Sequence, residues 1–181
     1  KPLVVKQFPT GALTVEMLEA YLENLEQHSG ITPDCLVIDY PDLMKHDAKN
    51  KRIELGQLLE RLRGIAVTRN LALVAVSQGN RESEKAVTVT GDMAAEDISK
   101  LATADVCITY SQTRSEKQLG LARLLVEKSR NDRDKFSALI TQAYEIGQFC
   151  LDSIMLHEDY WELDINEDPK RKKPGRDDGD D

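Results

Sequence analysis

Apolar runs of membrane length, a recognisable signal peptide and paired cysteines are all missing from this 181-residue sequence. Without the first two features, we expect a soluble cytoplasmic protein. The three cysteines, Cys35, Cys107 and Cys150, lie in separate apolar segments and follow neither disulfide nor metal-ligand spacing. They are therefore predicted to be buried thiols in a reducing compartment.

Positive charge is also scarce, because 24 Lys and Arg face 32 Asp and Glu and the formal net charge is −8. The surface as a whole is not typical of nucleic-acid binding, and any such contact would have to come from local loops. A small hydrolase is disfavoured as well. The sequence has no Gly-x-Ser-x-Gly elbow, and His28, His46 and His157 do not lie at the ends of the predicted parallel strands.

The most informative stretch that is present is a short apolar run, Cys35 to Tyr40, with Asp39 near its end. Its β-branched residues, Val37 and Ile38, are typical of a strand buried on both faces of a parallel sheet. Because ligands of α/β proteins bind at the carboxyl ends of such strands, Asp39 is predicted to lie at the functional edge. A carboxylate there can bind Mg²⁺ together with substrate phosphates. An Asp after a strand is also a common turn former or helix cap, so both interpretations stay open on these residues alone.

Strands and helices alternate over the first half of the chain. A helix capped by Thr14 and stopped by Gly30 precedes this strand, and a second helix with a leucine stripe ends near Asn70. The charged residues of the second helix, among them Arg61 and Arg63, are predicted to form a solvated face with no further role. Two further apolar runs are predicted as strands, at residues 3–5 and 71–76. This alternation predicts βαβ units and a parallel sheet in a single domain.

The second half is predicted to be mainly antiparallel and to end in a disordered tail. We expect a polar loop over 79–91, a short helix over 94–101, a strand over 106–110 and a charged linker over 111–120. Three loosely alternating segments follow, at 121–128, 136–143 and 149–156. The turn Glu145–Gly147 between the last two segments is a hairpin signal. Residues 1–163 are therefore expected to form the folded domain, and the charged residues 164–181 a tail.

Polar residues follow the predicted strands in a recognisable order. Asp39-Tyr40 comes first, then Ser77-Gln78 after a later strand, then Ala104-Asp105 before a strand, and finally Glu127-Lys128-Ser129-Arg130-Asn131. Over about residues 1–155 this order resembles the RecA-like ATPase domain of DnaB-type replicative helicases, which are hexameric motors that unwind DNA, and of their phage relatives. The resemblance implies an α/β fold with a predominantly parallel sheet flanked by helices, and with antiparallel strands and a hairpin toward the C-terminus.

The resemblance also implies an ATP and Mg²⁺ site. Asp39 looks like the Walker B aspartate, which binds Mg²⁺ through water, and Tyr40 and Leu43 match the Asp-Tyr-x-x-Leu continuation. Gln78 stands where the family places a polar sensor. Its amide could hydrogen-bond the γ-phosphate and report the loss of that phosphate to the following loop.

Further residues are implied to act across subunit boundaries and on DNA. Lys128 and Arg130 match the Lys-x-Arg of the arginine-finger element, and residues two apart on a strand point to the same face. Two cations aimed at a neighbour's γ-phosphate suit phosphoryl transfer. In the loop from residue 81 to 92, which the family directs at single-stranded DNA, Arg81 and Lys85 are the cations. A hexameric ring, and contacts with primase or other replisome proteins, are implied partners.

One motif of the family is absent from the sequence. No Gly-x-x-x-x-Gly-Lys-Ser/Thr occurs, and in the family this loop and the water-activating glutamate lie before the strand that opens this chain. We expect either a piece of a larger helicase or a protein without its nucleotide cradle, and we expect the 181 residues alone neither to hydrolyse nor to bind ATP tightly. Two other interpretations stay open. One is another RecA-like ATPase, such as a recombinase or clock-type ATPase, and the other is a non-catalytic interaction domain.

Overall fold

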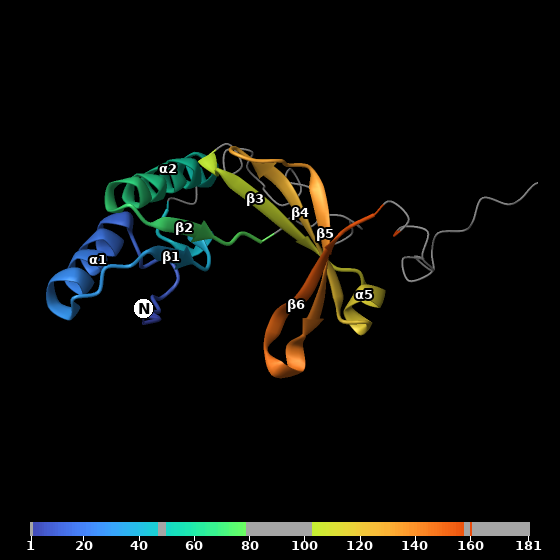
Figure 1. Cartoon of the computed structure of the whole chain (residues 1–181). Helices are drawn as coiled ribbons and strands as arrows, with labels where there is room; N and C mark the ends of the chain where they lie inside the picture. The colour runs from blue at the N-terminus through green and yellow to red at the C-terminus, as the bar shows by residue number, and fades with distance from the viewer. Residues whose placement is uncertain (1, 47–49, 79–102, 158–159, 161–181) are drawn as a thin grey trace, which may run out of the picture.

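The computed structural model describes residues 2–46, 50–78, 103–157 and 160. Figure 1 shows two parts, a pair of helices beside a small sheet toward the N-terminus and a twisted sheet formed by the later strands. Among the described residues, the first sheet has two strands and the second has four.

Two capped helices build the first part. Helix α1 spans Val15–Ser29, and the Thr14 hydroxyl accepts a hydrogen bond from the backbone N–H of Met17 at 3.2 Å. Gly30 ends the helix in the left-handed conformation, with φ of 63°, which glycine adopts without a steric penalty. Helix α2 spans Lys51–Arg69 and ends at Asn70 in the same conformation. The predicted cap and both helix ends are confirmed.

Strands β1 (Cys35–Ile38) and β2 (Ala72–Ala75) pair in parallel, with Ile38 opposite Ala75. The helices and one face of this pair share a single apolar core, whose buried members are Val15, Leu18, Leu22, Ile38, Met44, Leu55, Leu58, Leu62 and Ile65. The prediction that β1 is buried on both faces is wrong, because Cys35 is exposed and Val37 is 61% exposed. Within the described residues the helices cover one face of the pair only.

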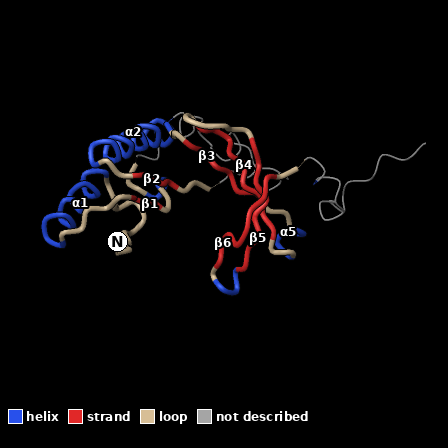
Figure 2. Tube along the Cα trace, viewed as in Figure 1, coloured by secondary structure: helices blue, strands red, loops and turns tan. Residues whose placement is uncertain are grey.

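The second sheet is antiparallel throughout and consists of β3 (Val106–Ser111), β4 (Leu121–Ser129), β5 (Phe136–Ala143) and β6 (Gln148–Met155). Strands β5 and β6 are joined by the short helix η3 (Tyr144–Ile146) and by Gly147 at φ of 70°, which confirms the predicted hairpin. Figure 2 shows this hairpin projecting from the twisted sheet. Gly120 directly precedes β4, with φ of 66°, and an added Cβ would lie 2.8 Å from the Gln142 carbonyl oxygen. A side chain therefore does not fit at that turn.

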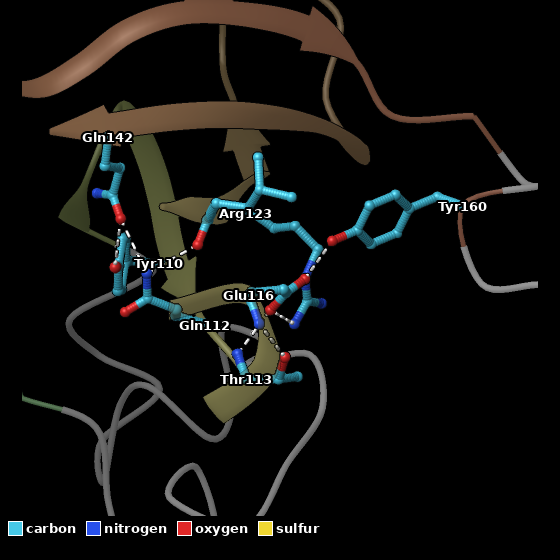
Figure 3. A network of polar contacts seen from close by, with 8 residues as sticks. Tyr110, Gln112, Thr113, Glu116, Arg123, Gln142 and Tyr160 are labelled. Atoms are coloured by element: carbon cyan, nitrogen blue, oxygen red, sulfur yellow. Dashed lines mark hydrogen bonds and ion pairs between the residues drawn. The ribbon is translucent and has the colours of Figure 1, made fainter. Parts of the chain in front are cut away.

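The connection from β3 to β4 is held by a buried carboxylate (Figure 3). It contains the five-residue helix α5 (Arg114–Gln118), with Thr113 and Glu116 forming a capping box. The Arg123 guanidinium donates to both oxygens of Glu116, Nε to Oε1 at 2.6 Å and Nη2 to Oε2 at 3.1 Å. The Tyr160 hydroxyl donates to the same carboxylate at 2.6 Å. The predicted charged linker thus contains an ordered helix, and Glu116 is fully buried.

The predicted α/β fold is confirmed, with two local corrections. Residues 3–5 form no strand, and Leu3 is 90% exposed. Cys35 and Cys150 are exposed and Cys107 is half-buried, so the prediction of buried thiols is wrong for the first two. The predicted loop over 79–91, the helix over 94–101 and the tail over 164–181 lie outside the described residues. No helix among the described residues is long and apolar enough to cross a membrane.

Candidate functional site

Asp39 and Gln78 leave the parallel sheet at the same edge. Asp39 directly follows β1, and Gln78 lies three residues beyond the end of β2. The pairing extends past the strands, because the backbone N–H of Val76 donates to the Ile38 carbonyl at 3.1 Å. Both side chains are exposed. The carboxyl ends of adjacent parallel strands therefore present an acid and an amide to one region of solvent, as the order of residues predicts.

The segment after Asp39 is tied to the N-terminal turn. The short helix η1 (Pro41–Leu43) follows, with Tyr40 half-buried at its start, and the Asp39–Tyr40 peptide bond is cis. The Gly11 N–H donates to the Leu43 carbonyl at 2.8 Å, and Gly11 has φ of 73°. This hydrogen bond ties the segment that follows Asp39 to the turn before α1.

The carboxylate of Asp39 fits one way of binding Mg²⁺. Among the described residues no group of three or more His, Cys, Asp or Glu side chains could hold a metal ion. Mg²⁺ is nevertheless commonly held by one or two carboxylates, with phosphate oxygens and water completing the octahedron. An exposed single carboxylate at a strand end suits that mode, whereas a site made of protein ligands alone does not exist in this part of the chain.

The two predicted cations lie at the end of β4, beside Asp105. Lys128 is opposite Cys107 in the β3–β4 register. Arg130 follows the strand, its backbone N–H donates to the Asp105 carbonyl at 2.9 Å, and its Nη1 contacts Asp105 Oδ1 at 2.8 Å. The Arg130 side chain is 50% exposed. It therefore has a partner inside its own chain and is still accessible to a second one.

A further arginine joins this cluster, which sequence reasoning missed. Arg63 of α2 donates to both oxygens of Asp105, at 2.7 and 3.0 Å, and to the Thr103 carbonyl at 2.9 Å. Arg61 likewise pairs with Glu16 of α1. These arginines lie on an exposed face, as predicted, with side chains 52% and 37% exposed, but the prediction that they have no further role is wrong, because each pairs with another element. The i, i+4 pattern of α2 carries no signal for partners that lie 42 and 45 residues away.

The electrostatics of the cluster favour the ionised acid. Hydrogen bonds from Arg63 lower the pKa of the Asp105 carboxyl, and the charges of Arg63, Arg130 and Lys128 lower it further. The same contact raises the pKa of the Arg63 guanidinium. One carboxylate is thus surrounded by three cations, and the cluster keeps an excess of positive charge.

The two predicted DNA-contacting cations, Arg81 and Lys85, lie outside the described residues. Their assignment stays a prediction from the sequence.

Solved structures share this fold. One of them is an ATPase domain, which matches with a TM-score of 0.63 and 15% sequence identity, covering 80% of this chain and 52% of that one. A DnaB-like replicative helicase, described with its interactions with primase, matches with a TM-score of 0.60 and 14% identity, covering 71% of this chain and 32% of that one. No curated protein matches the chain. These likenesses show that the chain has a RecA-like α/β fold.

A comparison with models of protein families identifies the family of this chain. The model of the DnaB-like helicase C-terminal domain matches residues 1–143, so this chain belongs to that family. The chain spans about half the length of the solved ATPase domain and about a third of the solved replicative helicase.

Proposed function

We propose that this chain is part of the motor domain of a ring-forming replicative helicase, which couples ATP hydrolysis between subunits to movement along single-stranded DNA and to duplex unwinding. The observation that carries the proposal is the common edge at which Asp39 and Gln78 leave two paired parallel strands. The family match supports the assignment to a helicase over a recombinase or a scaffold.

In this proposal the two sides of a subunit have different tasks. Asp39 would hold Mg²⁺, and the bound ion would supply positive charge against the phosphates of the nucleotide. Gln78 hydrogen-bonds the γ-phosphate and detects its loss. Lys128 and Arg130 act on the nucleotide of the neighbouring subunit, where they stabilise the charge that develops on the transferred group.

The proposed partners are single-stranded DNA and other copies of the same subunit. Arg81 and Lys85 are proposed to touch the phosphates of the DNA strand, and six copies would multiply a weak contact. A primase contact is proposed by analogy with the DnaB-like helicase whose interactions with primase are known. The proposed setting is the cytoplasm of a bacterial or phage-infected cell.

The test uses the natural gene product that contains these residues, with the variants Asp39→Asn and Arg130→Ala. Each variant alone should lose ATP turnover, by about 10³-fold or more for the arginine. Mixed rings should recover turnover, because an interface can then combine an intact Asp39 from one subunit with an intact Arg130 from the next. Mixtures that stay inactive would refute a site shared between subunits, and turnover without duplex unwinding would point to a recombinase.

The 181-residue chain by itself should not bind Mg-ATP tightly, because it contains no phosphate-binding Gly-x-x-x-x-Gly-Lys-Ser/Thr loop. Isothermal titration is the direct measurement. Affinity in the micromolar range would contradict this expectation.

A further inference from the structure

Asp105 joins two arginines that are anchored to very different degrees. Arg63 makes three hydrogen bonds, two to the Asp105 carboxylate and one to the Thr103 carbonyl. The Arg130 side chain forms an ion pair with the same carboxylate, with its Nη1 2.8 Å from Asp105 Oδ1. The carboxylate is therefore oriented mainly by Arg63, and its Oδ1 oxygen also contacts Arg130.

This asymmetry matters because an arginine side chain has many rotamers in solution. An ion pair between the Arg130 guanidinium and a carboxylate that Arg63 already holds restricts those rotamers before any ligand arrives. The backbone adds to the restriction, because the Arg130 N–H is bonded to the Asp105 carbonyl. The guanidinium stays half-exposed, so a phosphate oxygen can take over the contact without unfolding the strand end.

The charges around Asp105 also favour such an exchange. Arg63 satisfies the carboxylate when Arg130 turns away, so no unpaired charge is left behind. Arg130 exchanges one oxygen anion for another. Lys128 lies close enough for its charge to lower the pKa of Asp105, so it adds positive potential on the same side.

We propose that Asp105, oriented by Arg63, is the positioning residue that aims Arg130 at the nucleotide of the neighbouring subunit. The inference rests on the proposed function, since it assigns a supporting contact to the proposed arginine finger. It adds Asp105 and Arg63 to the finger side of the interface, where the resemblance to the helicase family implies a role only for Lys128 and Arg130.

The test variant is Asp105→Asn, in the natural gene product that contains this chain. The asparagine keeps the shape of the side chain but loses the charge that orients both guanidinium groups. The expected result is a kcat about 10- to 100-fold lower, because a misplaced catalytic group costs rate on that order, with an unchanged Kd for nucleotide. Asp134→Asn is the matched control, since this acid is exposed in the next turn, and it should leave kcat unchanged.

Mixed rings then decide on which side of the interface Asp105 acts. Asp105→Asn subunits mixed with Asp39→Asn subunits should recover turnover, because some interfaces then combine the intact Asp39 of an Asp105→Asn subunit with an Arg130 that is still positioned by Asp105 in an Asp39→Asn subunit. Asp105→Asn subunits mixed with Arg130→Ala subunits should not exceed the turnover of pure Asp105→Asn rings, because both substitutions then impair the same arginine-finger side of the interface. Recovery with Arg130→Ala would overturn the proposal, and so would normal kcat in Asp105→Asn rings.

Loss of fold is separated from loss of positioning within the same experiment. An Asp105→Asn subunit that restores turnover to Asp39→Asn rings must itself be folded and assembled. If it restores nothing, while Asp39→Asn and Arg130→Ala subunits do restore one another, Asp105 is merely structural and the inference fails alone. If mixtures of Asp39→Asn and Arg130→Ala subunits also stay inactive, the proposed site shared between subunits is refuted. Arg63→Gln provides a second variant, for which the same partial loss and the same pattern of recovery are expected.

Discussion

Two carboxylates in this chain bind arginine in similar ways but in different surroundings. Glu116 is fully buried with Arg123, which is 2% exposed, and Tyr160 caps the pair. Asp105 is 49% exposed, between Arg63 at 37% and Arg130 at 50%. Both acids have a lowered pKa. For Glu116, burial alone would raise the pKa, and the hydrogen bonds from Arg123, Thr113 and Tyr160 outweigh it.

The difference in burial indicates that the Glu116 cluster stabilises the fold, whereas a contact in the Asp105 cluster can be exchanged for another. Removing one partner of a buried pair leaves a charge without water or counter-ion, and that is costly. In the Asp105 cluster, water and a spare arginine are at hand, so a lost contact costs little. The Glu116 cluster therefore holds α5 and the segment at Tyr160 on the sheet, whereas the Asp105 cluster can release Arg130 to another anion.

The largest expected effect is on folding stability, from Arg123→Ala. The substitution strands the buried Glu116 carboxylate and should lower the free energy of unfolding by about 3–5 kcal/mol. Urea denaturation of the 181-residue chain measures this loss. Arg130→Ala is the matched control at an exposed pair and should cost far less. If Arg123→Ala and Arg130→Ala lower the free energy of unfolding equally, the buried and the exposed cluster do not differ in their contribution to stability.

A smaller loss is expected from Tyr160→Phe. The substitution removes one hydrogen bond to Glu116 but leaves the Arg123 fork in place, so the free energy of unfolding should fall by about 1–2 kcal/mol. Denaturation of Tyr160→Phe, Glu116→Gln and the double variant would give the coupling energy of the two side chains. Additive losses would mean that the hydroxyl does not stabilise the carboxylate.

Arg63→Gln should change the titration of Asp105 with little change in stability. The variant removes the hydrogen bonds that lower the Asp105 pKa most, so this pKa should rise toward the ordinary value of 3.8. Carbon-detected NMR of the Asp105 carboxyl measures the shift. Added salt should also raise the pKa of Asp105 in the unsubstituted chain, because exposed charges are screened. If neither Arg63→Gln nor added salt changes the Asp105 pKa, Arg63 does not orient this carboxylate.

The smallest effect is expected at Glu16, the exposed partner of Arg61. This contact lowers the pKa of Glu16 to about 2 from 4.5. Because the folded pKa lies below the unfolded one, the pair stabilises the fold above pH 4.5, and this contribution disappears as the pH falls from 4.5 toward 2. In Arg61→Gln the pKa should return toward 4.5 by NMR titration. An unchanged pKa would rule out Arg61 as its cause.

Features that depend on near neighbours in the sequence were predictable. Thr14 and Gly30 bound α1 because a hydroxyl and a left-handed glycine satisfy helix ends within a turn or so. The predicted segment 136–143 coincides with β5, and the predicted hairpin turn falls at Gly147. Asp39 and Gln78 reach one edge because consecutive strands joined by a helix pair in parallel.

The sequence by itself therefore determined the caps of α1, the order α1, β1, α2 and β2, the order of strands β3 to β6, and the edge to which Asp39 and Gln78 belong. These features follow from hydrogen bonds and periodicity over a few residues, whereas the helix α5 was not predicted and residues 3–5 form no strand. Only the tertiary structure decided which acids and arginines meet. Arg63 and Asp105 lie 42 residues apart, and Glu116 and Tyr160 lie 44 apart. No local pattern links such residues, because their contacts are set by how whole helices and strands pack. Packing also decided that Val37 is exposed, since the described helices cover one face of β1 and β2.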